Sequence, residues 1–178
     1  INRLLEKYGV TISKKYVMDS QCCETYHNQY GILELYWAPL LQKEQLNNKN
    51  AITSNLGNVI MLQSAPLEIK ENDGVKSTVL VESSAKAWTQ DPEGLMLNPL
   101  VLTPPEDTKS LAKRNLMVLL EGEFNSAFDQ APLSSEKQEE GQGDYSISTH
   151  LSKSKQAGKI IVAGTSMITT PQVFPDDA

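Results

Sequence analysis

The sequence contains little arginine, and this shortage argues against nucleic-acid binding. Only Arg3 and Arg114 are arginines, and the sixteen basic residues are outnumbered by twenty-two acidic ones, which gives a net charge of -6. Proteins that hold phosphate backbones usually present a basic surface, often rich in guanidinium groups. We therefore expect no nucleic acid among the partners of this chain.

Cysteine and histidine are equally scarce. The two cysteines, Cys22 and Cys23, are adjacent, so they cannot connect distant segments by a disulfide. We interpret them as ordinary thiols, although a vicinal disulfide or a reactive pair is the alternative. The two histidines are His27 and His150, and no second pair of ligands with zinc spacing accompanies them. The sequence predicts no metal site and no cofactor.

Long apolar runs are missing as well. No run approaches the roughly 20 residues needed to span a bilayer, and residues 1–9 lack the pattern of a signal peptide. The chain starts without methionine inside an amphipathic pattern and stops shortly after a strand-like segment. We therefore expect residues 1–178 to form one domain of a longer protein, with any membrane tether outside this fragment.

Short apolar segments are abundant, and they predict a sheet. Ile1, Leu4, Leu5 and Tyr8 have the spacing of one helix face, with Gly9 as the expected end of the helix. The segments expected as strands are 10–12, 16–18, 32–36, 59–62, 77–81, 100–102, 116–120 and 159–164. Three of them, 79–81, 116–120 and 160–162, are apolar on both faces and are expected as neighbouring central strands.

Polar segments separate these strands. Residues 19–31 are expected to form a loop, and the run from Ile32 is expected to stop at Trp37-Ala38-Pro39. Residues 129–158 are rich in serine, glutamate, glutamine and glycine, which predicts a mobile polar excursion on the surface. The pattern as a whole predicts an α/β fold with an open, mostly parallel or mixed sheet.

Small polar residues follow two of the predicted core strands. They are Ser83 and Ser84 after one strand, and Gly164, Thr165 and Ser166 after another. Open parallel sheets bind ligands at the carboxyl ends of their strands, so these residues are the candidate ligand-binding positions, and we expect them to lie close together. The alternative is that small residues only permit tight turns there.

The motifs of common enzymes are incomplete. Gly164-Thr165-Ser166 resembles the start of a nucleophile elbow, but Ile168 stands where that motif requires glycine. A catalytic triad would have to recruit a histidine from a polar loop. Gly141-Gln142-Gly143 lies in a low-complexity stretch rather than between a strand and a helix, so it predicts no nucleotide site. We expect a protein without catalytic residues.

Several strings together resemble a known family. They are LLEKYGVTI, YGILELYWAPLL, NAITSNLGNVIMLQSAPLEI, VKSTVLVESSAKAW, NLMVLLEGEFNSAF and KIIVAGTSMI, in this order along the chain. In this order they resemble the extracytoplasmic auxiliary component of an uncharacterised ABC-type transport system. That family includes a gliding-motility protein of Bacteroidetes. Its last motif often has an acidic residue directly after the glycine, whereas this sequence has Thr165.

The resemblance implies a Rossmann-like α/β domain, similar also to a domain of an intraflagellar-transport subunit. It implies a non-catalytic role at the periplasmic face of the cytoplasmic membrane, with the transporter's membrane subunit and ATPase as partners. Two other functions remain open from the residues alone. One is a serine-dependent hydrolase of sugar or peptide substrates using Ser84 or Ser166, which a histidine or carboxylate within hydrogen-bond reach would favour. The other is a soluble receptor, which a deep, partly apolar cleft would favour.

Overall fold

The computed structural model describes residues 1–95, 97–128 and 151–169, and within them the chain is built mainly from antiparallel strands. Only one short α-helix, α1 (Asn2–Leu5), and four 3-10 turns accompany the strands in this part of the chain. The strands are β1 (Val10–Ile12), β2 (Tyr16–Asp19), β3 (Cys22–His27), β4 (Gly31–Leu41), β5 (Val59–Ile60), β6 (Leu67–Ile69), β7 (Val75–Glu82), β8 (Ala87–Gln90), β9 (Asn115–Gly122) and β10 (Gly158–Ala163). The 3-10 turns are η1 (Glu6–Tyr8), η2 (Lys43–Gln45), η3 (Thr108–Ser110) and η4 (Met167–Thr169).

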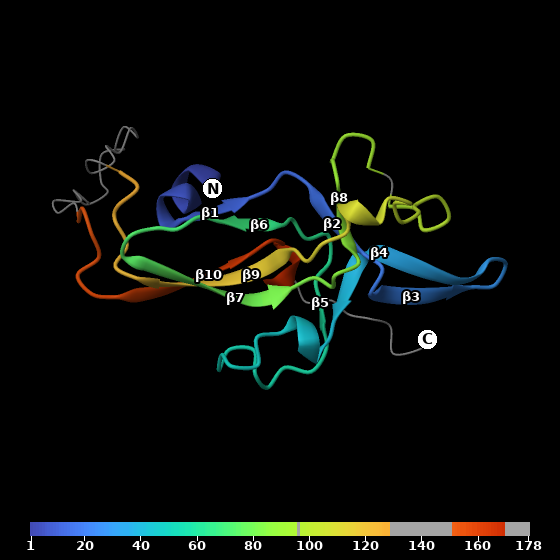
Figure 1. Cartoon of the computed structure of the whole chain (residues 1–178), viewed down its shortest axis with the longest axis horizontal. Coiled ribbons are helices and arrows are strands. Elements are labelled where there is room, and N and C mark those ends of the chain that lie inside the picture. The colour runs from blue at the N-terminus through green and yellow to red at the C-terminus, as the bar shows by residue number, and fades with distance from the viewer. Residues whose placement is uncertain (96, 129–150, 170–178) are drawn as a thin grey trace, which may run out of the picture.

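The three-stranded sheet β10-β9-β7 is the centre of the larger half of the molecule (Figure 1). β9 lies between its two partners, and its apolar side chains are buried on both faces. One face packs against the β1-β6 pair through a cluster that includes Val10, Leu67 and Leu120. The other face packs against a cluster that includes Leu41, Met61 and Leu119. The continuous apolar run of β9 is therefore explained by cover on both sides.

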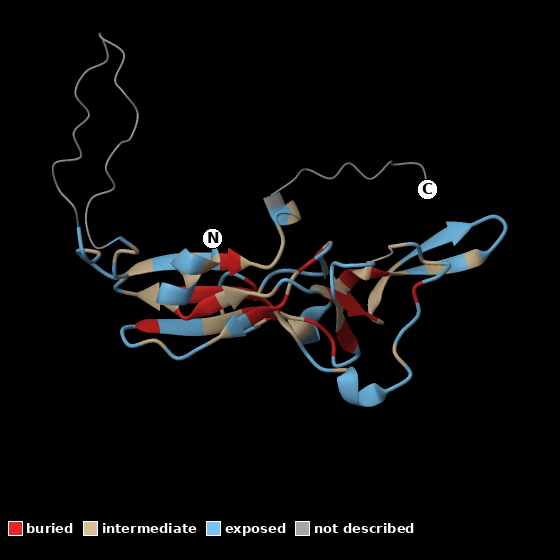
Figure 2. Ribbon diagram, turned by 90° about the horizontal axis from the view of Figure 1, so that it is seen from above, coloured by how far each residue is buried: buried red, intermediate tan, exposed pale blue. Residues whose placement is uncertain are grey.

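The other half of the molecule contains the β2-β8 pair and the β3-β4-β5 sheet. Met18, Tyr36 and Trp88 form its core, and the rings of Tyr36 and Trp88 are 5.3 Å apart. From this core the β3-β4 hairpin projects away from the rest of the chain (Figure 1). Figure 2 shows buried residues concentrated in the middle of the molecule and mostly exposed or half-buried residues along the hairpin. The molecule is thus elongated, with the hairpin at one end.

The expected Rossmann-like α/β fold with a mostly parallel sheet is wrong. Every strand pair in the described residues is antiparallel. A parallel pair needs a crossover connection of a dozen or more residues, usually a helix, and none of the described connections contains a helix of that length. Continuous apolar strands were interpreted as signs of a parallel sheet, but here a second layer of strands and loops covers them.

The expected core strands are neighbours, but not all of them are central. Residues 79–81, 116–120 and 160–162 lie in β7, β9 and β10, and β9 pairs with both of the others. β10 is an edge strand within the described residues, and Ile161 is 51% exposed. The prediction of a central position was therefore correct only for residues 116–120. It was wrong for 160–162 and also for 79–81, because β7 is the other edge strand of this sheet, although Leu80 and Val81 are buried.

The expected positions of individual helices, strands and loops are only partly confirmed. A helical segment that ends at Gly9, a left-handed residue with φ of 80°, is confirmed, although its α-helical part is only α1 and η1 completes it. Of the expected helix face, Leu5 and Tyr8 pack against the core, whereas Ile1 and Leu4 are exposed. Residues 19–31 are not one loop, because β3 occupies part of them, and β4 continues through Trp37-Ala38-Pro39 to Leu41. Residues 100–102 form no strand. Residues 129–150, most of the expected polar excursion, lie outside the described residues.

Candidate functional site

The candidate residues lie where β7 and β10 leave the central sheet. Both strands run antiparallel to β9, so they end at the same edge, beside the start of β9. The backbone N–H of Ser83 donates to the Arg114 carbonyl at 2.8 Å, and that of Gly164 donates to the Leu116 carbonyl at 2.9 Å. The two segments therefore flank the start of β9 from opposite sides.

Ser83 is fully buried, and both hydrogen-bonding functions of its hydroxyl are used inside the protein. The Ser83 Oγ accepts from the Arg114 backbone N–H at 2.8 Å and donates to the Ser84 carbonyl at 3.2 Å. The side chain thereby extends the pairing of β7 with the segment that leads into β9. Its geometry explains a structural role and leaves it no access to a ligand.

Ser84 contacts a buried carboxylate that belongs to β2. The Ser84 Oγ donates to Asp19 Oδ1 at 2.5 Å, and the Ser84 backbone N–H donates to Asp19 Oδ2 at 2.7 Å. Asp19 Oδ1 also accepts from the Gln21 N–H, and the Ser84 Oγ accepts from the Lys86 N–H at 3.0 Å. Because Asp19 is fully buried, these bonds replace its lost hydration and connect β2 to the end of β7.

Gly164 is required by a close backbone approach. Its carbonyl accepts from the Ala65 N–H at 2.8 Å, and an ideal Cβ at this position would lie 2.0 Å from the Ala65 carbonyl oxygen. The Thr165 Oγ1 accepts from the Met167 N–H at 3.1 Å, which starts the η4 turn. For Gly164 the alternative explanation, that a small residue permits a tight exit from the strand, agrees with this geometry.

The two candidate segments line different pockets. Ser84 lines a pocket of about 460 Å³ that also includes Gln21, Gln45, Lys86 and Lys113. Gly164, Thr165 and Ser166 line a separate one of about 290 Å³. A single ligand site that combines both segments, as the parallel-sheet model implied, is not formed, because β9 lies between them.

The one described histidine, His27, is not beside the candidate serines. His27 is the last residue of β3, at the far end of the hairpin, where its ring is 4.9 Å from that of Tyr30. His150 lies outside the described residues. In the described part of the chain no group of three or more metal-ligating side chains gathers at one point. The carboxylate of Asp19 is the one titratable group found in hydrogen-bond contact with Ser84 there.

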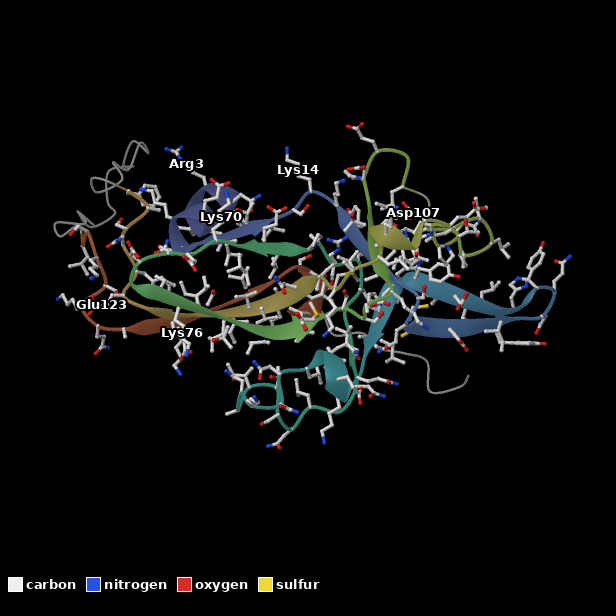
Figure 3. All side chains as sticks on the ribbon, in the orientation of Figure 1. Arg3, Lys14, Lys70, Lys76, Asp107 and Glu123 are labelled. Atoms are coloured by element: carbon white, nitrogen blue, oxygen red, sulfur yellow. The ribbon has the colours of Figure 1, made fainter. Side chains whose placement is uncertain are left out.

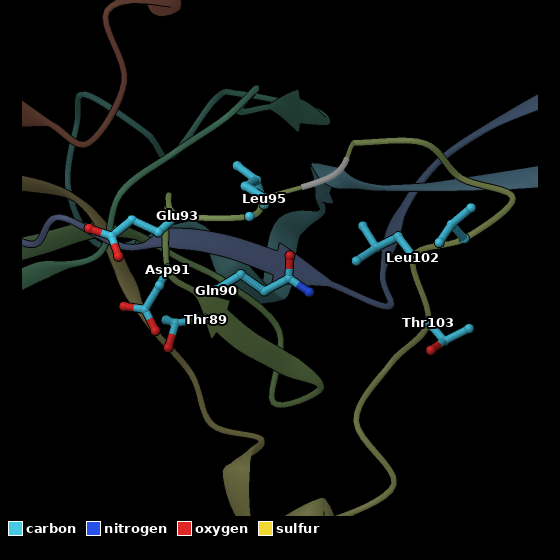
Figure 4. Close-up of a pocket in the computed structure, with 9 residues that line it drawn as sticks. Thr89, Gln90, Asp91, Glu93, Leu95, Leu102 and Thr103 are labelled. Carbon is cyan, nitrogen blue, oxygen red and sulfur yellow. The ribbon is translucent and has the colours of Figure 1, made fainter.

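A third pocket, of about 580 Å³, lies beyond the end of β8 (Figure 4). Its lining includes Asp91 and Glu93 on one side and Leu102 and Thr103 on the other. Asp91 forms an ion pair with Lys15 at 3.5 Å. The pocket is open to solvent, so it lacks the deep enclosure expected of a receptor for a small ligand.

The environment of the cysteine pair suppresses thiolate formation. Burial, with a smaller contribution from Glu34, raises the pKa of Cys22 from 9.0 to about 12. Burial also raises the pKa of Cys23. The thiolate is the reactive form of cysteine, so the folded protein holds both thiols in their unreactive form at neutral pH.

The comparisons with known proteins identify the chain at the level of its family. A family model described as an ABC-type uncharacterized transport system matches residues 1–177. The chain belongs to this family of ABC-transport auxiliary components. The comparisons with curated proteins and with solved structures gave no match.

The family's auxiliary role agrees with the finding that Ser83 and Ser84 are buried and form hydrogen bonds inside the protein. None of the described helices has the length and apolar character needed to cross a bilayer.

The residue that sequence reasoning missed is Asp19, although an acidic residue directly after the apolar run Tyr16-Val17-Met18 is a usable signal for a buried hydrogen-bonding group. The exposed hairpin of β3 and the first part of β4 was also not predicted, because residues 19–31 were expected to form a loop.

Proposed function

We propose that this domain is a non-catalytic binding or scaffolding component of an ABC-type transporter assembly. It acts at the extracytoplasmic face of the cytoplasmic membrane, beside the transporter's membrane subunit and ATPase. The observation that carries the proposal is the family match over nearly the whole chain. The resemblance described above extends it to a transporter linked to gliding motility.

The architecture supports a scaffolding role. Ser83 and Ser84 are buried, and their hydroxyls are held by internal hydrogen bonds. The pocket beyond the end of β8 is open to solvent, whereas the β3-β4 hairpin exposes large apolar side chains. Exposed apolar surface of this kind marks protein contact sites more often than small-molecule sites.

Co-purification tests the proposal. The full-length protein that contains this sequence is tagged and expressed with the membrane subunit and the ATPase of the same transport system. We expect both subunits to purify with the tagged protein in detergent, in fixed ratio. A tagged, unrelated periplasmic protein serves as the control. Purification of the tagged protein without either subunit would contradict the proposal.

The contact between Ser84 and Asp19 favours a second candidate, a serine hydrolase, because a carboxylate lies within hydrogen-bond reach of a hydroxyl. A serine nucleophile needs a base that removes its proton and also an open path for substrate. Ser84 is only 6% exposed, and its oxygen already accepts a bond from the Lys86 N–H. Ser84→Ala and Ser166→Ala variants screened with generic ester and peptide substrates decide between the two functions. Turnover that one of these substitutions abolishes would establish the hydrolase.

A further inference from the structure

The β3-β4 hairpin is a two-stranded ribbon whose outer part has no other layer on it. Its turn ends at Gly31, a left-handed residue with φ of 78°, and the Tyr30 N–H donates to the His27 carbonyl. β5 pairs with β4 only at Leu40 and Leu41, near the base. Among the described elements, β3 packs closely only against β4. An isolated two-stranded hairpin is at best marginally stable in water, so a surface that completes it has a clear energetic benefit.

One face of this ribbon is apolar at its outer end. Tyr26 and Ile32 are directly opposite each other in the register, and they are 72% and 67% exposed. Tyr30, in the turn, is also exposed. Figure 2 shows that the hairpin is the part of the molecule where exposed strand residues extend farthest from the buried centre. Large side chains in this arrangement are typical anchors of protein interfaces.

The same face is acidic one step closer to the base. Glu24 is directly opposite Glu34, and like charges in this position destabilise an antiparallel pair. Glu34 also accepts a hydrogen bond from the Tyr36 hydroxyl, which holds its carboxylate in place. The sequence contains no lysine or arginine from Tyr16 to Gln42. In Figure 3 the labelled basic residues, Arg3, Lys14, Lys70 and Lys76, lie away from the hairpin, in the half of the molecule that contains the central sheet.

We propose that this face, made of Glu24, Tyr26, Ile32 and Glu34, is a docking surface for an extracytoplasmic segment of the transporter's membrane subunit. The segment carries a lysine or arginine beside an apolar side chain. Its cation lies between Glu24 and Glu34 and relieves their repulsion, and its apolar side chain covers Tyr26 and Ile32. The partner's identity rests on the function proposed above, whereas its chemistry follows from the hairpin.

Two other occupants fit the surface less well. A second copy of the same hairpin would bring the acidic pair against another acidic pair, which opposes association. An anionic membrane surface would likewise repel Glu24 and Glu34, although the apolar tip alone could enter a neutral bilayer. The basic and apolar protein segment is the occupant that satisfies both parts of the face.

The test uses the full-length protein co-expressed with the membrane subunit and ATPase. A photo-crosslinking amino acid replaces Tyr26 in one variant and the exposed Lys76 of β7 in another. In a second experiment Glu24→Lys and Glu34→Lys are combined, and Glu68→Lys with Glu71→Lys is the control with the same change in net charge. Glu68 and Glu71 are exposed and lie outside the hairpin. Circular dichroism checks that each variant is folded, and Tyr26→Ser with Ile32→Ser replaces the charge reversal if that variant fails to fold.

We expect crosslinks to the membrane subunit from position 26 and none from position 76. We also expect the hairpin charge reversal to lower co-purification at least about tenfold, and the control to leave it nearly unchanged. Intact co-purification of the charge-reversed and the serine variants would overturn the docking surface and leave the proposed function standing. If the unmodified protein itself fails to co-purify with the membrane subunit and ATPase, the proposed function is overturned instead. Binding to neutral phosphatidylcholine vesicles that depends on Tyr26 and Ile32, without crosslinks to protein, would assign the surface to lipid.

Discussion

At the residue scale, the buried carboxylate of Asp19 organises the end of the central sheet. It accepts hydrogen bonds from the backbone and side chain of Ser84 and from the backbone of Gln21. A buried polar group is tolerated only when such bonds replace those it would make with water. Ser84 is therefore best understood as a structural partner of Asp19, which joins β2 to the exit of β7.

Ser84→Ala should destabilise the domain. The substitution removes one hydrogen bond to a buried carboxylate and leaves part of its desolvation uncompensated, at a cost of about 1–3 kcal/mol. Urea unfolding followed by circular dichroism measures the change in the free energy of unfolding. Ser77→Ala is the matched control, because the Ser77 side chain in β7 is exposed, and it should change stability by less than about 0.5 kcal/mol. Equal effects of the two substitutions would show that the Asp19 contact contributes nothing.

At the element scale, the central sheet is held in place by contacts at the ends of its strands as well as by the pairing between them. β10 leaves the sheet at Gly164, where the chain turns against the backbone of Ala65. This contact joins the end of β10 to the loop before β6, so two sheets are connected through main-chain groups. A glycine is required there because no side chain fits between the two backbones.

Gly164→Ala should therefore destabilise the connection between β10 and the loop before β6. The added Cβ would lie 2.0 Å from the Ala65 carbonyl oxygen, so one backbone segment has to move, and forced displacement of packed groups costs about 1–3 kcal/mol. The thermal unfolding midpoint reports the loss. The comparison is Gly57→Ala, since nothing lies within 4 Å of an ideal Cβ at Gly57. A Gly164→Ala protein as stable as the Gly57→Ala protein would refute the steric explanation.

At the scale of the whole molecule, the chain is an elongated body with an exposed hairpin at one end (Figure 1). The hairpin begins beside the core of Met18, Tyr36 and Trp88. Two groups of this region have raised pKa values: burial raises that of Cys22 to about 12, and burial with the hydrogen bond to Glu34 raises that of Tyr36 to about 12. The free energy of unfolding therefore depends on pH in the alkaline range, through the ionisation of Cys22 and Tyr36 at the base of the hairpin.

Alkaline pH should destabilise the folded protein. Cys22 has an ordinary pKa of 9.0 and Tyr36 one of 10.0, so between these values and about 12 the unfolded chain loses protons that the folded chain retains. The unfolded state then binds fewer protons, and the free energy of unfolding falls as pH rises. The stabilisation is complete below pH 9.0 and is lost as pH approaches about 12. Urea unfolding at a series of pH values measures this slope, and Cys22→Ser should reduce it. An unchanged slope in that variant would show that Cys22 is not responsible.

The sequence by itself determined the local features that depend on neighbouring residues. The helical segment that ends before Gly9 and the apolar strand at residues 116–120 follow from spacing and side-chain type. The family resemblance, carried by ordered strings along the chain, agrees with the family match. These features are local because capping, turn geometry and strand preference act over a few residues.

Only the tertiary structure decided the direction of the strands and the partners of the buried polar groups. An apolar strand such as β9 has the same composition whether helices or other strands cover it, so the sequence did not distinguish a parallel sheet from the antiparallel one. Asp19 and Ser84 are far apart in the chain and meet because β2 and the exit of β7 pack together. The exposed hairpin face likewise depends on register, since pairing alone places Glu24 opposite Glu34 and Tyr26 opposite Ile32.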